Sequence, residues 1–411
     1  MPSVILLGTL DTKGPEYAFL RDELAARNIG TTVIDAGVLG EPSFKPDIDR
    51  GAVARAAGVE LDGLVAGNDR GAAVEAMSRG AATLVRDLHE KGEVAGIIGL
   101  GGTGGTTLIT AAMRALPVGV PKLMVSTVAS GDTRAYVGAT DISMMYSVVD
   151  IAGINKISRR ILSNAAGAIA GMATPGRTTN DSDDRPLIGT TMFGVTTPCV
   201  QKARELLEAK GYEVLVFHAT GTGGQSMEAL VDAGMLVGVL DTTTTELADE
   251  LVGGVFSAGP TRLTAAGRAG IPQVVSLGAL DMVNFGPRET VPLQFEGRNL
   301  YKHNASITLM RTTPQECAEL GKRVAERLSS GSGVRKLFIP LRGISLIATE
   351  GQVFHNPDAD SALIAAIKAH LSDAVELHEV DTDINDPAFA AVLVDALVDA
   401  TSNENQGATN G

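Results

Sequence analysis

The sequence of 411 residues contains no tryptophan, only 4% aromatic residues and only two cysteines. So few aromatic rings make stacking a poor source of ligand affinity, and backbone-lined loops a better one. Cys199 and Cys317 are too few for a disulfide framework and too isolated for a zinc site, so we expect both to be buried. Glycine or a charge interrupts every apolar run within about ten residues, which is too short for a membrane span.

A basic segment followed by an apolar stretch is also missing at the N terminus, where residues 3–7 predict a β-strand instead of a signal peptide. We therefore expect a cytoplasmic protein. Lys and Arg number 34 against 48 Asp and Glu, which gives a net charge of −14. Such a surface repels phosphate backbones, so we expect neither nucleic acid nor a membrane as partner. A local cluster of backbone N–H groups can still bind a small anion.

What the sequence has in abundance is glycine, with 48 residues, and short apolar runs that alternate with alanine-rich amphipathic segments. This alternation predicts an α/β fold of two Rossmann-like doubly wound domains with mainly parallel sheets. In the first half we expect strands at residues 4–7, 32–34, 63–65, 96–98 and 123–125, and helices at 16–27, 71–88 and 106–116. In the second half we expect strands at residues 187–193, 214–217, 236–240, 273–276, 307–310 and 336–339.

The domain boundary is expected at residues 174–186, which have two prolines, several short polar residues and no large apolar residue. The domains would then span residues 1–173 and 187–400, and residues 401–411 would be a disordered tail. Both halves begin with a strand, a turn and a proline near a helix start. Each half also has a second, glycine-rich loop, at residues 99–107 and 217–228.

The loop at residues 99–107, GLGGTGGTT, lies between an expected strand and an expected helix. Glycines allow the backbone to approach a ligand, and a helix N terminus offers free N–H donors and partial positive charge. We therefore predict a phosphate or carboxylate site. It is neither a Walker A motif nor a strict dinucleotide fingerprint, and the alternative is a turn that only packs helix against sheet. The candidate nucleotide-binding residues are Gly101, Gly102, Thr103, Gly104, Gly105, Thr106 and Thr107.

The loop after the first strand, residues 8–14, adds Gly8, Thr9, Asp11, Thr12 and Lys13 as candidates. Lys13 could pair with a phosphate, and Asp11 could hold a magnesium ion that bridges phosphates. Alternatively, Asp11 or Thr12 caps the following helix. Another expected strand ends before Ser130 and Gly131, which we expect to line the same cleft.

In the second half, His218 follows a strand directly and precedes a glycine loop, which suits an acid–base residue. Glu228, Asp281 and His303 are the other catalytic candidates. Residue types that bind a hydroxylated carboxylate gather nearby, and either arginine could clamp a carboxylate through two hydrogen bonds. These candidate substrate-binding residues are Thr220, Gly221, Thr244, Arg262, Asn284 and Arg311. Each residue alone has an alternative as a surface-loop residue.

Several long motifs resemble those of uncharacterised protein family 0261. They include GTLDTKGPE, GLGGTGGTT, FHATGTGGQSMEAL, GVLDTTTTELADEL and HNASITLMRTT, and the similarity covers essentially residues 1–400. The resemblance implies two Rossmann-like subdomains, ATP with Mg²⁺ at the glycine loops, and a homodimer. It places the nucleotide on Gly101, Gly102, Gly104, Gly105 and Thr106, with Gly8, Thr9, Asp11 and Thr12 adjacent. An apolar, helix-like stretch at residues 144–162 could form the dimer contact, or could equally be a core helix.

Three functions remain open from the sequence. The first is an ATP-binding enzyme of small-molecule metabolism, acting on a sugar acid or keto acid in an interdomain cleft with His218 as base. The second is a non-catalytic ATP-binding module that regulates dimerisation or a protein partner. The third is an ATP-independent enzyme that cleaves acyl or carbon–carbon bonds, in which the glycine loops hold a substrate carboxylate or phosphate.

Overall fold

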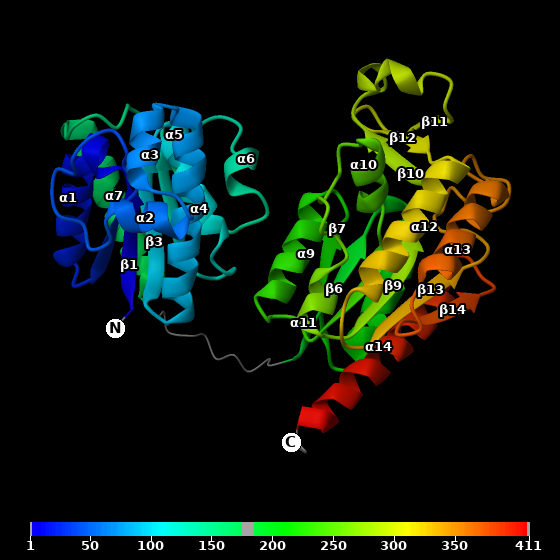
Figure 1. The fold of residues 1–411 in the computed structure, drawn as a ribbon. Helices are drawn as coiled ribbons and strands as arrows, with labels where there is room; N and C mark the ends of the chain where they lie inside the picture. Colours follow the sequence, from blue (N-terminus) through cyan, green and yellow to red (C-terminus); the bar gives the residue numbers. More distant parts are fainter. Residues whose placement is uncertain (1, 175–184, 409–411) are drawn as a thin grey trace. The chain divides into compact units, whose positions relative to one another are not determined.

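The computed structural model describes residues 2–174 and 185–408 and divides the chain into two compact units, Met1–Asp181 and Ser182–Gly411 (Figure 1). We call them unit 1 and unit 2. The division falls within the expected linker at residues 174–186, of which 175–184 lie outside the described residues.

Unit 1 is built on one parallel sheet of five strands in the order β2-β1-β3-β4-β5. The strands are β1 (Ser3–Gly8), β2 (Thr31–Asp35), β3 (Val94–Gly101), β4 (Lys122–Ser126) and β5 (Ser143–Tyr146). The connections that leave the carboxyl ends of the neighbouring strands β1 and β3 lead to helices on opposite faces of the sheet, α1 (Leu10–Ala25) and α5 (Thr103–Arg114). This topological switch point is where doubly wound sheets bind ligands.

Helices cover both faces of this sheet, which explains why its inner strands are apolar on both sides (Figure 1). One face packs against α1 (Leu10–Ala25) and α7 (Lys156–Ala173). The other packs against α2 (Arg50–Ala56), α4 (Arg70–Glu90) and α5 (Thr103–Arg114). Two short helices complete the unit, α3 (Leu61–Gly67) and α6 (Arg134–Val137).

Three expectations for unit 1 need correction. Residues 63–65, expected as a strand, lie in α3, which has no buried residue and therefore lacks the burial that an inner strand requires. The stretch 144–162 is not one helix, because α7 begins only at Lys156, where the Asn155 side chain forms a capping box with Ser158. Helix α1 begins at Leu10 instead of Glu16, with a kink at Lys13 ahead of Pro15.

Unit 2 repeats the strand order with one strand more. Its parallel sheet has the order β14-β13-β9-β8-β6-β7. Read from β7, this order matches that of unit 1: the second strand of the unit lies at the edge, the first strand lies beside it, and the other strands follow in chain order. The strands are β6 (Leu187–Met192), β7 (Glu213–His218), β8 (Gly238–Thr243), β9 (Gln273–Gly278), β13 (Arg335–Pro340) and β14 (Glu376–Val380). The switch point lies between β6 and β8. The predicted fold class, two doubly wound α/β domains with mainly parallel sheets, is confirmed.

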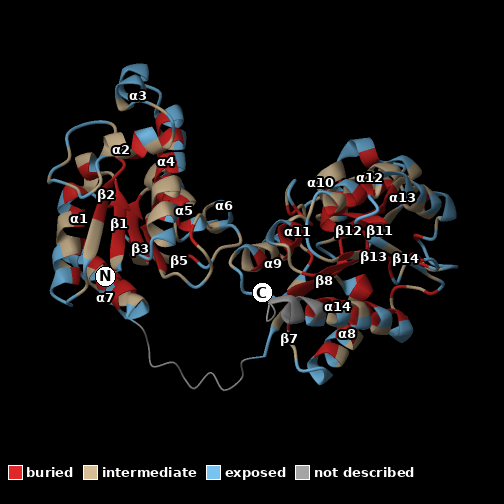
Figure 2. Cartoon of the chain, turned by 60° about the horizontal axis from the view of Figure 1, so that its bottom comes forward, coloured by how far each residue is buried: buried red, intermediate tan, exposed pale blue. Residues whose placement is uncertain are grey.

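The helices of unit 2 also form two layers (Figure 2). One layer consists of α8 (Thr197–Ala209) and α14 (Pro387–Ala408), and the other of α9 (Thr222–Asp232), α10 (Glu246–Val252), α11 (Ala265–Ala269), α12 (Pro314–Ser329) and α13 (Pro357–His370). Between β9 and β13 the chain forms a small antiparallel sheet of β10 (Met282–Phe285), β12 (Thr308–Arg311) and β11 (Leu300–Lys302). The strand expected at residues 307–310 is therefore present but belongs to this separate sheet.

The end of α14 differs from the expected disordered tail at 401–411, since the helix continues to Ala408. Thr401 is buried, and its hydroxyl lies 2.7 Å from the hydroxyl of Tyr212. This contact ties the polar start of the segment to the body of unit 2 and lets the helix continue. Residues 409–411 lie outside the described residues. Among the described helices, none has the length and apolarity that crossing a bilayer requires.

Candidate ligand site

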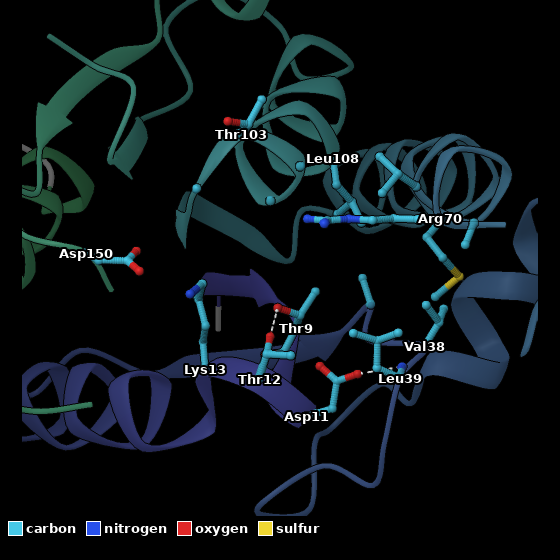
Figure 3. Close-up of a pocket in the computed structure, with 17 residues that line it drawn as sticks. Thr9, Asp11, Thr12, Lys13, Val38, Leu39, Arg70, Thr103, Leu108 and Asp150 are labelled. Carbon is cyan, nitrogen blue, oxygen red and sulfur yellow. Dashed lines mark hydrogen bonds between the residues drawn. The ribbon is translucent and has the colours of Figure 1, made fainter. Parts of the chain in front are cut away.

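Unit 1 contains a cavity of about 370 Å³ at the switch point of its sheet (Figure 3). It is lined by the loops that follow β1, β2 and β3, by the first turns of α4 and α5, and by Asp150 after β5. Of the sequence-predicted residues, the cavity is lined by Thr9, Asp11, Thr12, Lys13, Gly102, Thr103, Gly104 and Gly105. Residues more than 90 positions apart in the sequence thus meet at one edge of the sheet.

Tyr17 of α1 bridges the carboxyl ends of β1 and β3. Its hydroxyl donates to the carbonyl of Leu7 at 2.5 Å and accepts from the N–H of Leu100 at 2.8 Å. Burial raises the pKa of this hydroxyl, which keeps it protonated and able to donate. A Cβ atom at Gly8 would lie 1.9 Å from the Tyr17 hydroxyl. The position of Tyr17 therefore requires a glycine at residue 8, although Gly8 does not line the cavity.

The N terminus of α5 faces the cavity with free donors. The first helical hydrogen bond runs from the N–H of Thr106 to the carbonyl of Gly102 at 2.8 Å. The N–H groups of Thr103, Gly104 and Gly105 have no acceptor within the described part of the chain. Side chains are excluded where the loop folds back, because a Cβ atom at Gly101 would lie 2.9 Å from the backbone of Gly105. The glycines therefore leave three donors and the positive end of the helix dipole open to an anion.

Two cationic side chains reach the same space (Figure 3). The Lys13 ammonium donates to the carbonyl of Ile151 at 2.6 Å. Arg70, at the start of α4, extends toward α5, where a Cβ atom at Gly104 would lie 3.5 Å from its Nη2. No hydrogen bond or ion pair is recorded for Arg70 among residues 2–174 and 185–408. Arg70 lies in no recognisable motif, and the long connection between β2 and β3 brings it to the site.

Asp11 has a structural contact that limits its role. Its Oδ2 accepts hydrogen bonds from the N–H groups of Leu39 at 2.8 Å and Gly40 at 3.2 Å. Its Oδ1 is buried without a hydrogen-bond partner in the described chain. Asp11 thus anchors the loop after β2 and does not present a free carboxylate edge to the cavity. No group of three or more His, Cys, Asp or Glu side chains that could hold a metal ion occurs among the described residues.

Besides Gly8, the predicted nucleotide-binding residues that do not line the cavity are Gly101, Thr106, Thr107, Ser130 and Gly131. Thr106 is buried, with its hydroxyl 2.7 Å from that of Ser126. The hydroxyl of Thr107 donates to the carbonyl of Thr103 at 3.0 Å, and its side chain faces the outer groove between α4 and α5. Ser130 and Gly131 are exposed in a turn after β4. The helical rotation of about 100° per residue explains why Thr106 and Thr107 point away from the cavity, whereas Thr103, Gly104 and Leu108 of the same helix line it.

The second glycine loop, in unit 2, already binds a carboxylate of the chain itself. Oε1 of Glu246 accepts from the N–H groups of Gly221 at 2.7 Å and Gly224 at 3.0 Å. A Cβ atom at Gly224 would lie 2.1 Å from the same carboxylate. Two of the N–H donors at the start of α9 are therefore occupied by a carboxylate of the chain. Thr220 bonds only to the carbonyl of His218, at 3.4 Å.

Arg262, expected as a substrate clamp, is at the centre of a buried ion-pair cluster. Its Nη1 and Nη2 bind the two oxygens of Asp241 at 2.5 and 2.7 Å, and its Nε binds Glu246 at 2.6 Å. Glu228 lies 3.6 Å from Nη1. Burial raises the pKa of both Glu228 and Glu246, and Arg262 opposes this rise. Arg262 is 1% exposed, and its Nε, Nη1 and Nη2 atoms already bind carboxylates of the chain. The guanidinium is therefore not available to a substrate carboxylate.

Arg311 and Asp281 form part of a second buried network. The Arg311 guanidinium binds Asp360 at 2.6 Å and the carbonyl of Phe354 at 2.8 Å. Asp281 accepts from the hydroxyl of Ser345 at 2.8 Å, and burial raises its pKa to about 6. Both side chains are therefore committed to internal contacts.

The remaining candidates of unit 2 do not complete a catalytic cluster. Thr244 and Asn284 are buried, and they bond to the Ser276 carbonyl at 3.3 Å and to the Asp249 carboxylate at 3.1 Å. His218 and His303 are exposed, and no hydrogen bond of either ring is recorded for the described chain. Glu228 and Asp281 belong to separate networks. The four side chains that the sequence suggested for catalysis are thus not brought together by any contact in unit 2.

Comparison with known proteins gives one family for both units. The Uncharacterised protein family (UPF0261) N-terminal domain matches residues 2–178, and its C-terminal domain matches residues 185–401. A UPF0261 protein of Clostridium tetani is 53% identical over 96% of this chain and 98% of its own. The ToMV resistance protein Tm-1(GCR237) of Solanum lycopersicum is 40% identical over 97% of this chain, which spans 56% of the tomato protein.

Among solved structures, UDP-N-acetylglucosamine 2-epimerase from Rickettsia bellii matches 67% of this chain and 78% of its own at 10% identity, with a TM-score of 0.24. A TM-score this low carries no argument about the fold, for which the strand order is the evidence. The family matches cover nearly all of the chain and agree with the motifs quoted above. The chain belongs to the UPF0261 family.

Proposed function

We propose that unit 1 binds ATP in the cavity at its switch point, with the phosphates at the N terminus of α5. The observation that carries the proposal is the set of three N–H groups, on Thr103, Gly104 and Gly105, that face the cavity without acceptors among the described residues. These donors are partly or fully exposed, so water can occupy them in the free protein, and a phosphate oxygen can take the place of that water at the positive end of the helix dipole. The choice of ATP among anions comes from the family resemblance.

The cavity suits a nucleotide in size and in polarity. Its volume, about 370 Å³, lies in the range of small-molecule sites. One part offers Lys13, Arg70 and the α5 donors, and another part is lined by apolar side chains of α4, α5 and the loop after β2. A triphosphate requires the first environment and a nucleobase suits the second. The overall charge of −14 does not oppose this, since the local donors and cations act at much shorter range.

Magnesium, the second expected cofactor, would enter the site bound to the phosphates. Mg²⁺ typically keeps several waters and takes one or two carboxylates besides substrate phosphates. Asp150 supplies the exposed carboxylate at the cavity edge, near Lys13 (Figure 3). The hydroxyls of Thr9 and Thr12, 2.7 Å from each other, are further oxygens on this side. When bound, the ion would neutralise phosphate charge that Lys13 and Arg70 do not.

The proposal is binding of ATP, without a catalytic step. An ATP-dependent reaction on a sugar acid or keto acid would need acid–base groups that converge on one point. In unit 2 the proposed acid–base and clamp residues are either committed to buried networks or exposed without a partner group. A non-catalytic ATP-binding module is therefore the form of the hypothesis that the geometry supports best.

Calorimetric titration of the full chain with Mg·ATP tests this proposal. Arg70→Gln removes a charge-assisted contact worth about 1.5–3 kcal/mol, so affinity should fall about tenfold or more. Arg79→Gln is the matched control, because Arg79 lies on the same helix, pairs with exposed Glu75 and does not line the cavity. Loss of affinity in both variants, or in neither, contradicts the assignment of the cavity as the ATP site.

A further inference from the structure

The loop after β2 places an apolar side chain over the cavity in an unusually exposed position. Leu39 lines the cavity although its surface is 79% exposed. Figure 3 shows Leu39 and Val38 on the wall opposite Leu108 of α5. The wall continues with Val74 and Met77 of α4. Covering an exposed leucine beside an apolar wall with a flat apolar group lowers the free energy, because apolar surface is removed from water.

The same loop is held in place by hydrogen bonds that use up its donors. Asp11 accepts from the N–H groups of Leu39 and Gly40, and Asp35 accepts from that of Gly37 at 2.9 Å. The N–H of Ala36 donates to the carbonyl of Gly8 at 2.8 Å. From residue 36 to residue 40, only the N–H of Val38 has no acceptor within the described ranges. The loop can therefore present an apolar surface, and of its N–H donors only that of Val38 is left for a ligand.

We propose that this apolar wall takes the base of the bound nucleotide, with Leu39 covering the ring, and that the site discriminates weakly between bases. The inference rests on the proposed function, since it orients the nucleotide that unit 1 binds. The base lies toward Val38, Leu39 and Met77, and the phosphates lie toward Gly102, Thr103 and Lys13. Asp11 is then a positioning residue for the base wall and not a magnesium ligand.

Weak discrimination follows from the chemistry of the wall. A site that reads base edges needs fixed polar groups, and it rejects the wrong ligand strongly because those groups would be left unpaired. In the base wall the oxygens of Asp11 are engaged or buried, and Arg70 reaches toward Gly104 at the phosphate end. Apolar contact alone distinguishes similar rings by small factors. ATP, GTP and CTP should therefore bind within about tenfold of one another.

Calorimetry of the full chain with ATP, GTP, CTP and tripolyphosphate tests the inference. Leu39→Ser should weaken all three nucleotides about fivefold to tenfold through lost apolar contact and leave tripolyphosphate unchanged. Leu293→Ser in unit 2, where the leucine is 81% exposed, is the matched control and should change nothing. Unchanged nucleotide affinity in Leu39→Ser, or a preference for ATP above about a hundredfold, overturns the inference.

The design separates this inference from the proposed function. If tripolyphosphate and ATP bind equally well and Arg70→Gln weakens both, the anion site stands and the base wall is wrong. If neither tripolyphosphate nor ATP binds, the proposed function itself fails and takes the inference with it.

The role of Asp11 is tested by its conservative variant. Asp11→Asn keeps an oxygen that can accept from Leu39 and Gly40, whereas Asp11→Ala removes the anchor. If Asp11 positions the base wall, Asp11→Ala weakens ATP but not tripolyphosphate, and Asp11→Asn retains most of the ATP affinity. If Asp11 binds magnesium instead, both variants abolish the gain in tripolyphosphate affinity on adding Mg²⁺, and the positioning role is refuted.

Discussion

The two units share their strand order and a glycine-rich helix start, yet their helix N termini face opposite situations. In unit 1 the donors of Thr103, Gly104 and Gly105 open onto a cavity. In unit 2 the donors of Gly221 and Gly224 bind Glu246, a carboxylate of the same chain. Both loops are thus anion sites in the physical sense, and among the described residues the one in unit 1 opens onto a cavity whereas the one in unit 2 already binds an internal carboxylate.

Topology gives the reason for this difference. The loop at residues 99–107 follows β3, which borders the switch point of its sheet, whereas the loop at 217–228 follows β7, the edge strand. The position in unit 2 that matches β3 is β8, followed by residues 244–245 and α10. The sequence suggests that the two glycine loops correspond to each other, but they follow strands at non-equivalent positions in the two sheets. Equivalent sequence features acquire different roles because they stand at different strands.

The largest expected effect comes from breaking the filled site of unit 2. Arg262→Met leaves Asp241, Glu246 and Glu228 buried without their cation. Removing one partner of a buried ion pair typically costs about 3–5 kcal/mol, so the urea midpoint of unit 2 should fall markedly. Hydrogen exchange in β6 and β8 would locate the loss in this unit.

Arg268→Met is the control for that experiment, because Arg268 pairs with Asp232 at the surface and both side chains are about half exposed. Surface pairs contribute about 0–1 kcal/mol. Equal stability of the two variants would show that the Arg262 cluster does not hold the α9 loop, and the contrast between the units would lose its structural basis.

The second effect is the share of the pH dependence of unit 2 that originates in Asp281, beside that of Asp249, whose pKa burial raises to about 7. Burial raises its pKa from an ordinary value near 3.8 to about 6, so the folded state keeps a proton that the unfolded chain releases. The stability that this proton contributes is complete below about pH 3.8 and is lost as pH rises through about 6, to a total of about 3 kcal/mol.

Urea unfolding at pH 4, 5, 6 and 7 measures this loss. Asp281→Asn cannot ionise, so its stability should decline less over this interval than that of the parent chain. Asp232→Asn, at an exposed position, should keep the parent slope. A parent slope that is the same in all three proteins would exclude Asp281 as its origin.

The sequence predicted the fold well because the relevant signals are local. Apolar runs such as residues 4–7 and 123–125 are buried on both faces, and their strands lie where expected. Residues 63–65 misled because a three-residue apolar run does not distinguish an exposed helix from a strand. The capping box at Asn155 was a usable signal for the start of α7 and shows that the preceding residues are not helical.

The site was only half predictable, since half of it depends on distant contacts. The glycines and Thr103 could be identified because their chemistry lies in one short motif. Arg70, Leu39 and Asp150 could not, because they reach the cavity only through the course of the chain between strands. Nor does any local signal show that Glu246, 25 residues after Gly221, fills the loop of α9. Availability of a donor is a property of the tertiary structure.

The smallest expected effect, and the most direct test of the comparison, is to fill the open site of unit 1. Thr103 is exposed at the first position of α5, so Thr103→Glu places a carboxylate beside the free donors, as Glu246 does in unit 2. Its charge should repel the phosphates and lower Mg·ATP affinity about tenfold, while interaction with the helix dipole stabilises unit 1 by about 0.3–1 kcal/mol. Thr107→Glu carries the same charge one turn further along the helix, outside the cavity, and should affect ATP much less. If both variants weaken ATP equally, net charge and not occupation of the donors governs binding, and the difference between an open and a filled helix start does not explain why unit 1 would bind the nucleotide.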